Sequence, residues 1–160
     1  MTIAPPELLA RPISDFIPHR APMILIDSIV SHQSDSLITQ TQISPQSAYF
    51  DETLQGVPNY VGIEYMAQSI AALAGVEALL QGQPIKVGFL LGSRKLQMHQ
   101  QLFTLGQTYR THVTRLYQEE SGLAVFDCQI FHQDRLMAQA NVNVFQPADS
   151  QAYVNESHSA

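Results

Sequence analysis

The chain has 160 residues and a formal net charge of -6, from 8 Lys and Arg against 14 Asp and Glu. This length suits one domain with its own core, and the acidic balance disfavours a nucleic-acid binder, which needs a basic surface. The one cysteine, Cys128, excludes an internal disulfide and a Cys-rich zinc site, and its strand-like surroundings predict a small buried hydrophobe.

The first third of the chain predicts a lead-in, a fixed loop and a hairpin. Residues 1–12 are expected to be loose, with a helical turn around Pro6 to Leu9, and the two prolines of residues 14–22 indicate an ordered loop. Strands are expected over 23–30 and 37–43, followed by an irregular loop over 44–55. Nothing in the first ten residues resembles a signal peptide.

A long central helix is predicted from residue 59 or 60 to Leu80. It is apolar or small almost all round, which is typical of a buried helix, and its only charges are Glu64 and Glu77. Gly82 and Pro84 are suited to end it. Because Glu64, Gln68 and Glu77 interrupt this longest apolar stretch, no membrane span is expected, and a cytoplasmic protein follows.

After the helix the sequence predicts only strands. The first covers 86–91 and continues over 95–99 after a bend, and the others cover 109–117, 123–131 and 136–145. The expected fold is α+β, with a curved antiparallel sheet of about six strands wrapped around the helix. It forms one domain over 1–147, and a disordered polar tail is expected over 148–160. The Gly88–Gly92 stretch lacks the spacing of a phosphate-binding loop and precedes a strand.

Glu64 is the first candidate for chemistry. At helical spacing it shares a face with Gln68, Ala71 or Ala72, and Gly75, which would leave a groove for an extended ligand. Burial would help the carboxyl group keep a proton for general-acid work, and N–H groups of the first helical turn would be free to polarise a carbonyl oxygen. The alternative is a first-turn carboxylate favoured only by the helix dipole.

The other polar residues give weaker signals. His19 lies in the proline-fixed loop, where a structural role competes with a catalytic one. None of the six histidines pairs with another at metal-ligand spacing, so no metal site is expected. Arg94 and Lys95, with Lys86 nearby, form either a small basic patch for a phosphopantetheine phosphate or an acidic carrier protein, or ordinary solvated strand ends.

Several motifs together resemble the hotdog-fold β-hydroxyacyl-ACP dehydratases of the FabA/FabZ type, and most closely the ApeP branch associated with aryl-polyene biosynthesis. They are Ile17–Asp27 with its Pro-His-x-x-Pro, Gly56–Gln68 at the helix start, Gly88–Arg94, Phe126–Cys128 and Asn143–Pro147. The resemblance implies a central helix in a curved sheet, dimerisation by joined sheets, and a thioester tunnel along the dimer interface.

The resemblance also implies a reaction and a set of site residues. An imidazole removes the α-proton of a 3-hydroxyacyl thioester, and a helix carboxyl group protonates the departing hydroxyl. Glu64 matches the helix acid and Gln68 the glutamine one turn later. His19 would be the base, Tyr60, Gly62, Gly88 and Phe89 would line the thioester site, and Arg94 and Lys95 would dock the carrier. No cofactor is implied beyond the phosphopantetheine of ACP or CoA that carries the substrate.

One departure from the family pattern bears on activity. The usual catalytic histidine lies 14 residues before the acid, where this chain has Phe50. Three functions therefore stay open: a 3-hydroxyacyl-ACP dehydratase, a non-catalytic acyl-thioester-binding partner of an active hotdog dehydratase, and a hotdog acyl thioesterase. The implied partners are an acyl carrier protein or CoA thioester and a second hotdog subunit, identical or different.

Overall fold

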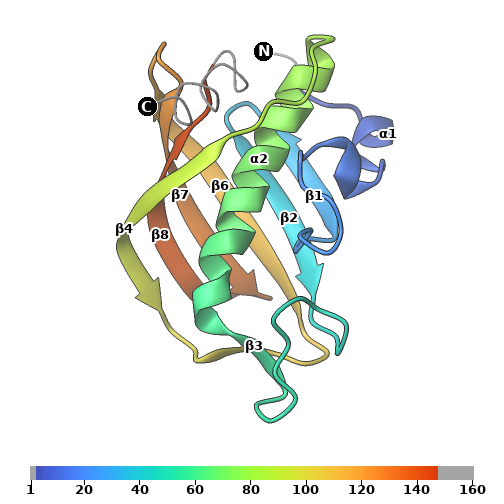
Figure 1. The fold of residues 1–160 in the computed structure, drawn as a ribbon, viewed down its shortest axis with the longest axis vertical. Helices are drawn as coiled ribbons and strands as arrows, with labels where there is room; N and C mark the ends of the chain where they lie inside the picture. The colour runs from blue at the N-terminus through green and yellow to red at the C-terminus, as the bar shows by residue number, and fades with distance from the viewer. Residues whose placement is uncertain (1–2, 148–160) are drawn as a thin grey trace, which may run out of the picture.

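The computed structural model describes residues 3–147, in which one long helix lies across the concave face of a curved sheet (Figure 1). The helix is α2 (Gly62–Leu80), and the six strands of the sheet run antiparallel in the order β1-β2-β6-β7-β8-β4. The bounds of the strands are β1 Ser28–Gln33, β2 Ser36–Gln42, β4 Phe89–Met98, β6 Thr108–Gln118, β7 Leu123–His132 and β8 Arg135–Phe145. The predicted α+β architecture, with a curved sheet around a central helix, is confirmed.

The core lies between the helix and the concave face of the sheet. Along β7 every second residue is buried, so that Ala124, Phe126, Cys128 and Ile130 face α2. Cys128 is fully buried, as its strand pattern predicts, and burial raises the pKa of its thiol, so it acts as a small hydrophobe.

Helix α2 ends at Leu80 as predicted and begins at Gly62, two or three residues after the predicted start. A 3-10 turn (Asn59–Val61) leads into it, and Gly82 follows its end with a φ of +67°, a left-handed conformation that glycine adopts without steric cost. Residues Asn59–Leu80 meet the length and composition criteria for a membrane span, which a buried core helix also meets, so this finding does not contradict the sequence expectation. In this fold half of that segment is buried inside the protein, and packing on the sheet accounts for its apolar character.

The segment before β1 packs against α2 and the first hairpin. Helix α1 (Pro6–Leu9) confirms the predicted turn, and Ala4 is buried, with its N–H donating to His32 Nδ1 at 3.0 Å. The described part of the expected loose lead-in is therefore docked on the core. The predicted tail, 148–160, lies outside the described residues.

A close contact with α2 fixes the loop between α1 and β1. A 3-10 turn (Ile13–Asp15) precedes the fully buried Phe16 and Ile17. Gly75 of α2 lies against the Phe16 carbonyl so closely that a Cβ on this glycine would overlap the carbonyl oxygen. The small residue in the helix thus lets the loop backbone rest directly on it.

The strand predictions need three corrections. Residues 23–27 were expected to belong to the first strand but lie before β1. The Gln68 side chain bonds to the backbone of Met23 and Leu25, and the Asp27 N–H donates to the Gln40 carbonyl of β2, in place of a continuous strand ladder. Two three-residue strands, β3 (Gly56–Pro58) and β5 (Leu102–Thr104), pair with each other and are too short to show an alternating pattern.

The third correction concerns β4, which is one strand and not a buried strand followed by a bend. It lies at the edge of the sheet, pairs only with β8 within the described residues, and is exposed over most of its length. Its register shifts between Leu90 and Gly92 and again between Arg94 and Gln97, and these irregularities absorb the predicted bend.

The Gly75 contact gives a stability prediction. Alanine normally stabilises a helix relative to glycine by about 1 kcal/mol, but in Gly75→Ala the added methyl must displace the Phe16 carbonyl. We expect the free energy of unfolding to fall by about 1–3 kcal/mol, measured by urea denaturation. The matched control is Gly92→Ala, where a Cβ meets nothing within 4 Å; equal stability of the two variants would contradict this account.

Candidate active site

A groove of about 370 Å³ runs beside α2, between the helix, the loop before β1, and strands β4, β6, β7 and β8. One helix face forms its floor, with small side chains at Ala67, Ala71, Ala74 and Ala78. These positions follow helical spacing, so they form a continuous stripe. The rest of the lining is Pro18, His19, Glu64, Ile70, Glu77, Gln81, Gln83, Lys86, Gly88, Phe89, Leu90, Arg115, Gln118, Gly122, Ala124, Phe126, Val144 and Gln146.

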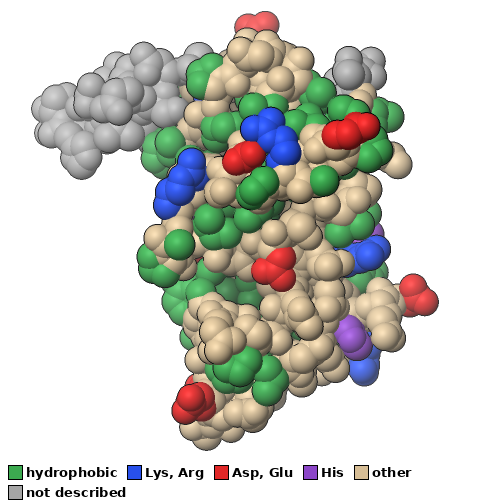
Figure 2. Space-filling view, turned by 90° about the vertical axis from the view of Figure 1, so that its right-hand side faces the viewer, with side chains coloured by type: hydrophobic (Ala, Val, Ile, Leu, Met, Phe, Trp, Pro, Cys, Tyr) green, Lys and Arg blue, Asp and Glu red, His purple; other side chains and the backbone are tan. Residues whose placement is uncertain are grey.

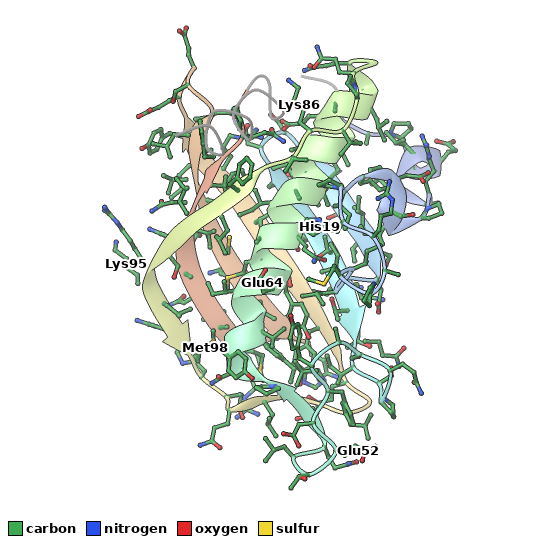
Figure 3. All side chains as sticks on the ribbon, in the orientation of Figure 1. His19, Glu52, Glu64, Lys86, Lys95 and Met98 are labelled. Carbon is green, nitrogen blue, oxygen red and sulfur yellow. The ribbon has the colours of Figure 1, made fainter. Side chains whose placement is uncertain are left out.

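His19 reaches the groove from the fixed loop before β1. One Arg20 guanidinium nitrogen donates to the carbonyls of Ser14, Ile17 and His19 at 3.2, 2.9 and 2.6 Å. Three carbonyls converging on one cation give the loop a defined backbone path. The loop therefore holds His19 at the groove beside α2 (Figure 3).

The His19 imidazole is suited to accept a proton. Burial lowers its pKa from the ordinary 6.5, and the nearby Glu64 carboxylate opposes part of that shift. The ring is therefore neutral at neutral pH. Its Nδ1 atom is buried without a hydrogen-bond partner in the described structure, so no other residue competes for it.

Glu64 lies in the first turn of α2 and lines the same groove. The carboxylate is exposed, so the expected burial is not provided by this chain alone. The Gly62 N–H already donates to the Asn59 carbonyl within the preceding 3-10 turn. The expectation of free first-turn N–H groups therefore does not hold for Gly62.

Gln68 lies outside the groove lining, on another flank of α2. Its side-chain N–H donates to the Met23 carbonyl at 2.7 Å, and its side-chain oxygen accepts from the Leu25 N–H at 2.9 Å. Gly75 also faces the loop and not the groove. The prediction that Glu64, Gln68 and Gly75 share one face of the groove is therefore wrong. Glu64 lines the groove, whereas Gln68 binds the segment that follows His19 and Gly75 contacts the loop.

The remaining predicted residues divide between the groove and the outer surface. Gly88 and Phe89 line the groove, whereas Tyr60 is 69% exposed and outside it. Lys95 points away from α2 in Figure 3, and neither it nor Arg94 contributes to the lining. Phe50 packs against the core and is not among the lining residues.

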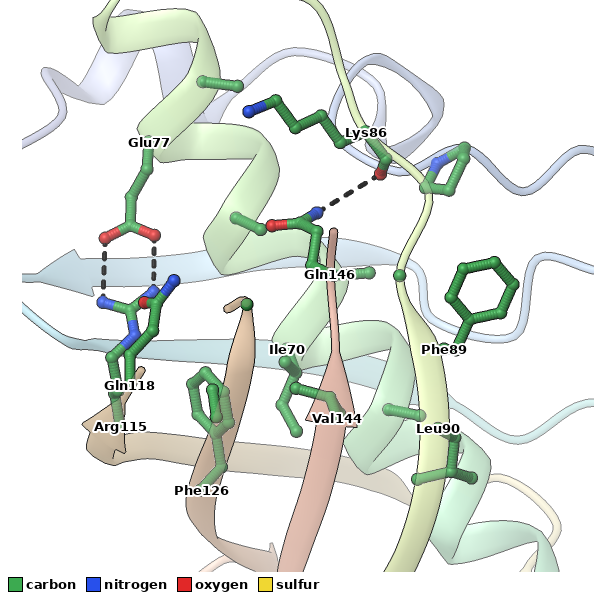
Figure 4. A pocket seen from close by; sticks show the side chains of 18 of the residues that line it. Ile70, Glu77, Lys86, Phe89, Leu90, Arg115, Gln118, Phe126, Val144 and Gln146 are labelled. Atoms are coloured by element: carbon green, nitrogen blue, oxygen red, sulfur yellow. Dashed lines mark hydrogen bonds and ion pairs between the residues drawn. The ribbon is translucent and has the colours of Figure 1, made fainter. Parts of the chain in front are cut away.

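At its other end the groove is bounded by a charge cluster that the sequence analysis did not assign. Arg115 of β6 pairs with both Glu77 carboxylate oxygens, at 2.6 and 3.0 Å (Figure 4). It also pairs with Asp35 at 2.7 Å. Burial lowers the pKa of Arg115, but its bonds to Glu77 and Asp35 outweigh that effect and raise it. Glu77 is therefore neutralised, which leaves Glu64 as the unpaired carboxylate of the groove lining.

A signal for this cluster was present in the sequence. The alternation of β6 places Arg115 on the same face as Tyr109, Thr111 and Val113, all buried. A charge on an inward face needs a partner of opposite sign. Glu77, the second charge of the central helix, could therefore have been predicted as the partner of Arg115.

The described residues contain no group of three or more His, Cys, Asp or Glu side chains that could hold a metal ion. The groove thus presents a neutral imidazole, a carboxylate and a stripe of small side chains between them and the Arg115 cluster. This arrangement is suited to proton transfer on an elongated ligand.

Comparison with known proteins identifies the family of this chain. The family model for ApeP-like proteins, described as ApeP dehydratase, matches residues 11–155. The chain belongs to the ApeP-like dehydratase family. FabZ, the 3-hydroxyacyl-acyl-carrier-protein dehydratase of Chlamydia trachomatis serovars D and L2, is 28% identical over 100 residues. That alignment covers 59% of this chain and 65% of the length of FabZ.

Solved structures show the same fold. The ApeI:P dehydratase heterocomplex of Xenorhabdus doucetiae has a TM-score of 0.83 and 23% identity, with 91% of this chain and 96% of that chain covered. A hypothetical thioesterase with coenzyme A from Streptococcus pneumoniae has a TM-score of 0.58 and 12% identity, covering 74% of this chain and 86% of that one. The hotdog fold that the motifs imply is confirmed.

The Arg115 cluster gives a prediction about its two acids. In Glu77→Gln the half-buried pair is lost and Arg115, whose side chain is 13% exposed, keeps one partner. We expect a loss of about 1–3 kcal/mol in the free energy of unfolding, by urea denaturation. Asp35→Asn is the control and should cost less than about 1 kcal/mol, because the Asp35 side chain is 47% exposed and screened by solvent. A larger loss of stability in Asp35→Asn than in Glu77→Gln would contradict the conclusion that Glu77 is the main partner of Arg115.

Proposed function

We propose that this protein acts on 3-hydroxyacyl thioesters as a dehydratase, with Glu64 as acid and His19 as base. The observation that carries the proposal is the placement of a neutral imidazole and an unpaired carboxylate in one groove, close enough to interact electrostatically. Membership of the ApeP-like family and the similarity to FabZ support the same reaction.

The reaction needs two proton transfers on adjacent carbons. The His19 imidazole takes the proton from the carbon next to the thioester carbonyl, and a carbon–carbon double bond forms as the bond to the hydroxyl group breaks. Glu64 in its protonated form gives the hydroxyl the proton with which it leaves as water. The imidazolium then returns its proton through solvent to the carboxylate, and the products are an enoyl thioester and water.

The shape of the groove suits an elongated thioester. From Glu64 to Glu77 the helix extends over about 20 Å, at 1.5 Å per residue, and small or apolar side chains line most of this length. Phosphopantetheine on ACP or CoA would present the thioester to His19 and Glu64. Gly88 and Phe89, at the beginning of β4, are the predicted site residues that line the groove besides His19 and Glu64.

A second hotdog subunit completes the proposed assembly. The groove is open in the single chain, Glu64 is exposed, and the outer edge of β4 has no partner strand among the described residues. On the side of the molecule away from β4, Figure 2 shows charges scattered among exposed hydrophobic side chains. The ApeI:P structure is described as a heterocomplex of dehydratase subunits, and we propose a comparable partner here.

One alternative function has a specific observation in its favour. Phe50 occupies the position of the usual catalytic histidine and packs against the core, so the chain resembles a binding subunit that supports an active partner. Thioester hydrolysis is supported only by the more distant structural similarity. Measuring both enoyl product and free acid from one acyl-ACP separates dehydration, hydrolysis and binding without turnover.

The acid assignment predicts a large effect of a small change. Glu64→Gln removes the proton donor and keeps the shape of the side chain, so we expect the dehydration rate to fall by about 10²–10⁴-fold, with unchanged melting temperature. Glu52→Gln, in the loop before β3 and outside the groove, should retain wild-type turnover. The assay follows enoyl thioester by absorbance, with the partner subunit present; full activity of Glu64→Gln would remove Glu64 from the mechanism.

The base assignment predicts a pH profile. His19 acts only when neutral, and its lowered pKa places the loss of activity on the acid side below pH 6.5. The profile of kcat/KM should thus show an acid limb below pH 6.5, and His19→Gln should lose about 10²–10⁴-fold in rate along with that limb. His99→Gln, exposed and outside the groove, serves as control. An unchanged limb in His19→Gln would place the base elsewhere.

A further inference from the structure

The edge strand β4 differs in charge from the rest of this acidic protein. No Asp or Glu occurs between Glu77 and Glu119, whereas five of the eight basic residues do: Lys86, Arg94, Lys95, Arg110 and Arg115. On β4 the only charges are Arg94 and Lys95, adjacent and both exposed. An otherwise acidic chain thus presents a cationic sheet edge.

Neither cation is neutralised within the described part of the chain. The ion pairs there join Arg11 to Asp15, and Arg115 to Asp35 and Glu77. The neighbouring strand β8 has one charge, Arg135, and the nearest acid across the sheet, Asp127, lies on β7, beyond Asn141. Two strand spacings, about 10 Å, separate Asp127 from β4, so this acid leaves the edge positive.

The same strand exposes apolar side chains that a partner would cover. Leu91 and Leu96 are 55% and 45% exposed, and Val87, just before the strand, is 41% exposed. Lys95 has a φ of +54° at the second register shift of β4. A bulge and a lysine on an edge strand discourage indiscriminate pairing with other strands. The exposed apolar side chains of this edge favour burial by a partner, and its bulge and charges limit which strands can pair with it.

We propose that Arg94 and Lys95 select a non-identical hotdog subunit, whose contacting strand carries carboxylates, over a second copy of this chain. This inference builds on the proposed function only in taking the partner to be a second hotdog subunit. A symmetric dimer uses the same patch on both chains, so a homodimer across β4 brings four positive charges together with no carboxylate on either strand. Like charges across an interface disfavour the wrong partner, and opposite charges favour the right one.

A charge-reversed copy of this chain serves as a partner of the required chemistry. In Arg94→Glu/Lys95→Glu the edge is acidic and the rest of the chain is unchanged. Wild type, the variant and their equimolar mixture are compared by sedimentation equilibrium and native mass spectrometry, with differently tagged chains. We expect the mixed dimer to be at least about tenfold tighter than either homodimer at low salt.

Salt supplies an independent readout. Added salt screens both repulsion and attraction between exposed charges, so it should strengthen both homodimers and weaken the mixed dimer. A statistical 1:2:1 distribution, equal salt dependence of all three dimers, or only monomers in every sample would overturn the proposal.

A neutral variant guards against loss of folding. If Arg94→Glu/Lys95→Glu does not fold by circular dichroism, Arg94→Gln/Lys95→Gln replaces it and should form homodimers more tightly than wild type. An acidic carrier protein is the other ligand expected for this pair. Loss of carrier binding on charge reversal, with strand pairing unaffected, would assign Arg94 and Lys95 to the carrier and contradict the proposal. Because the pairing measurements use no substrate, their outcome is independent of whether Glu64 and His19 carry out dehydration.

Discussion

The contact between Gly75 and the Phe16 carbonyl sets the distance between the central helix and the loop that carries His19. Since no side chain fits between them, the loop backbone rests directly on α2. Two more interactions fix the loop on either side of His19: Arg20 binds three carbonyls before β1, and Gln68 binds the Met23–Leu25 segment. Catalytic groups need support of this kind, because small displacements reduce their efficiency.

The two acids of α2 illustrate how the environment separates chemistry from structure. They lie thirteen residues apart on the same groove, yet Glu77 is tied to Arg115 through both of its oxygens. The Glu64 carboxylate makes no hydrogen bond or ion pair with another described residue, and it interacts electrostatically with His19. A single helix thus carries one acid that is tied into an ion pair and one that is free, and the free acid is the one proposed for the reaction.

The central helix, its ends and the long strands were predictable because each has a strong periodic pattern or a clear stop signal. Their contacts with other elements were less predictable. Gln68 looked like a groove residue from its spacing to Glu64, but the helix has several buried flanks, and only the tertiary structure shows which one meets the loop. Similarly, the apolar residues of β4 predicted a buried strand, whereas their exposure follows from its place at the edge of the sheet.

The contrast between Phe50 and Glu64 supports the interpretation that this chain retains part of a dehydratase site. Phe50 has a structural explanation, since its side chain packs against the core. Glu64 has none: it is exposed, it is bonded to no other described side chain, and it faces a groove whose floor is a stripe of alanines. A carboxylate that contributes nothing to the fold beyond a favourable position in the first helical turn, worth about 0.3–1 kcal/mol, is better explained by the reaction. In the proposed assembly, a second sheet that extends this one across β4 would also cover the groove around Glu64, so one partner would account for both the open groove and the unpaired edge.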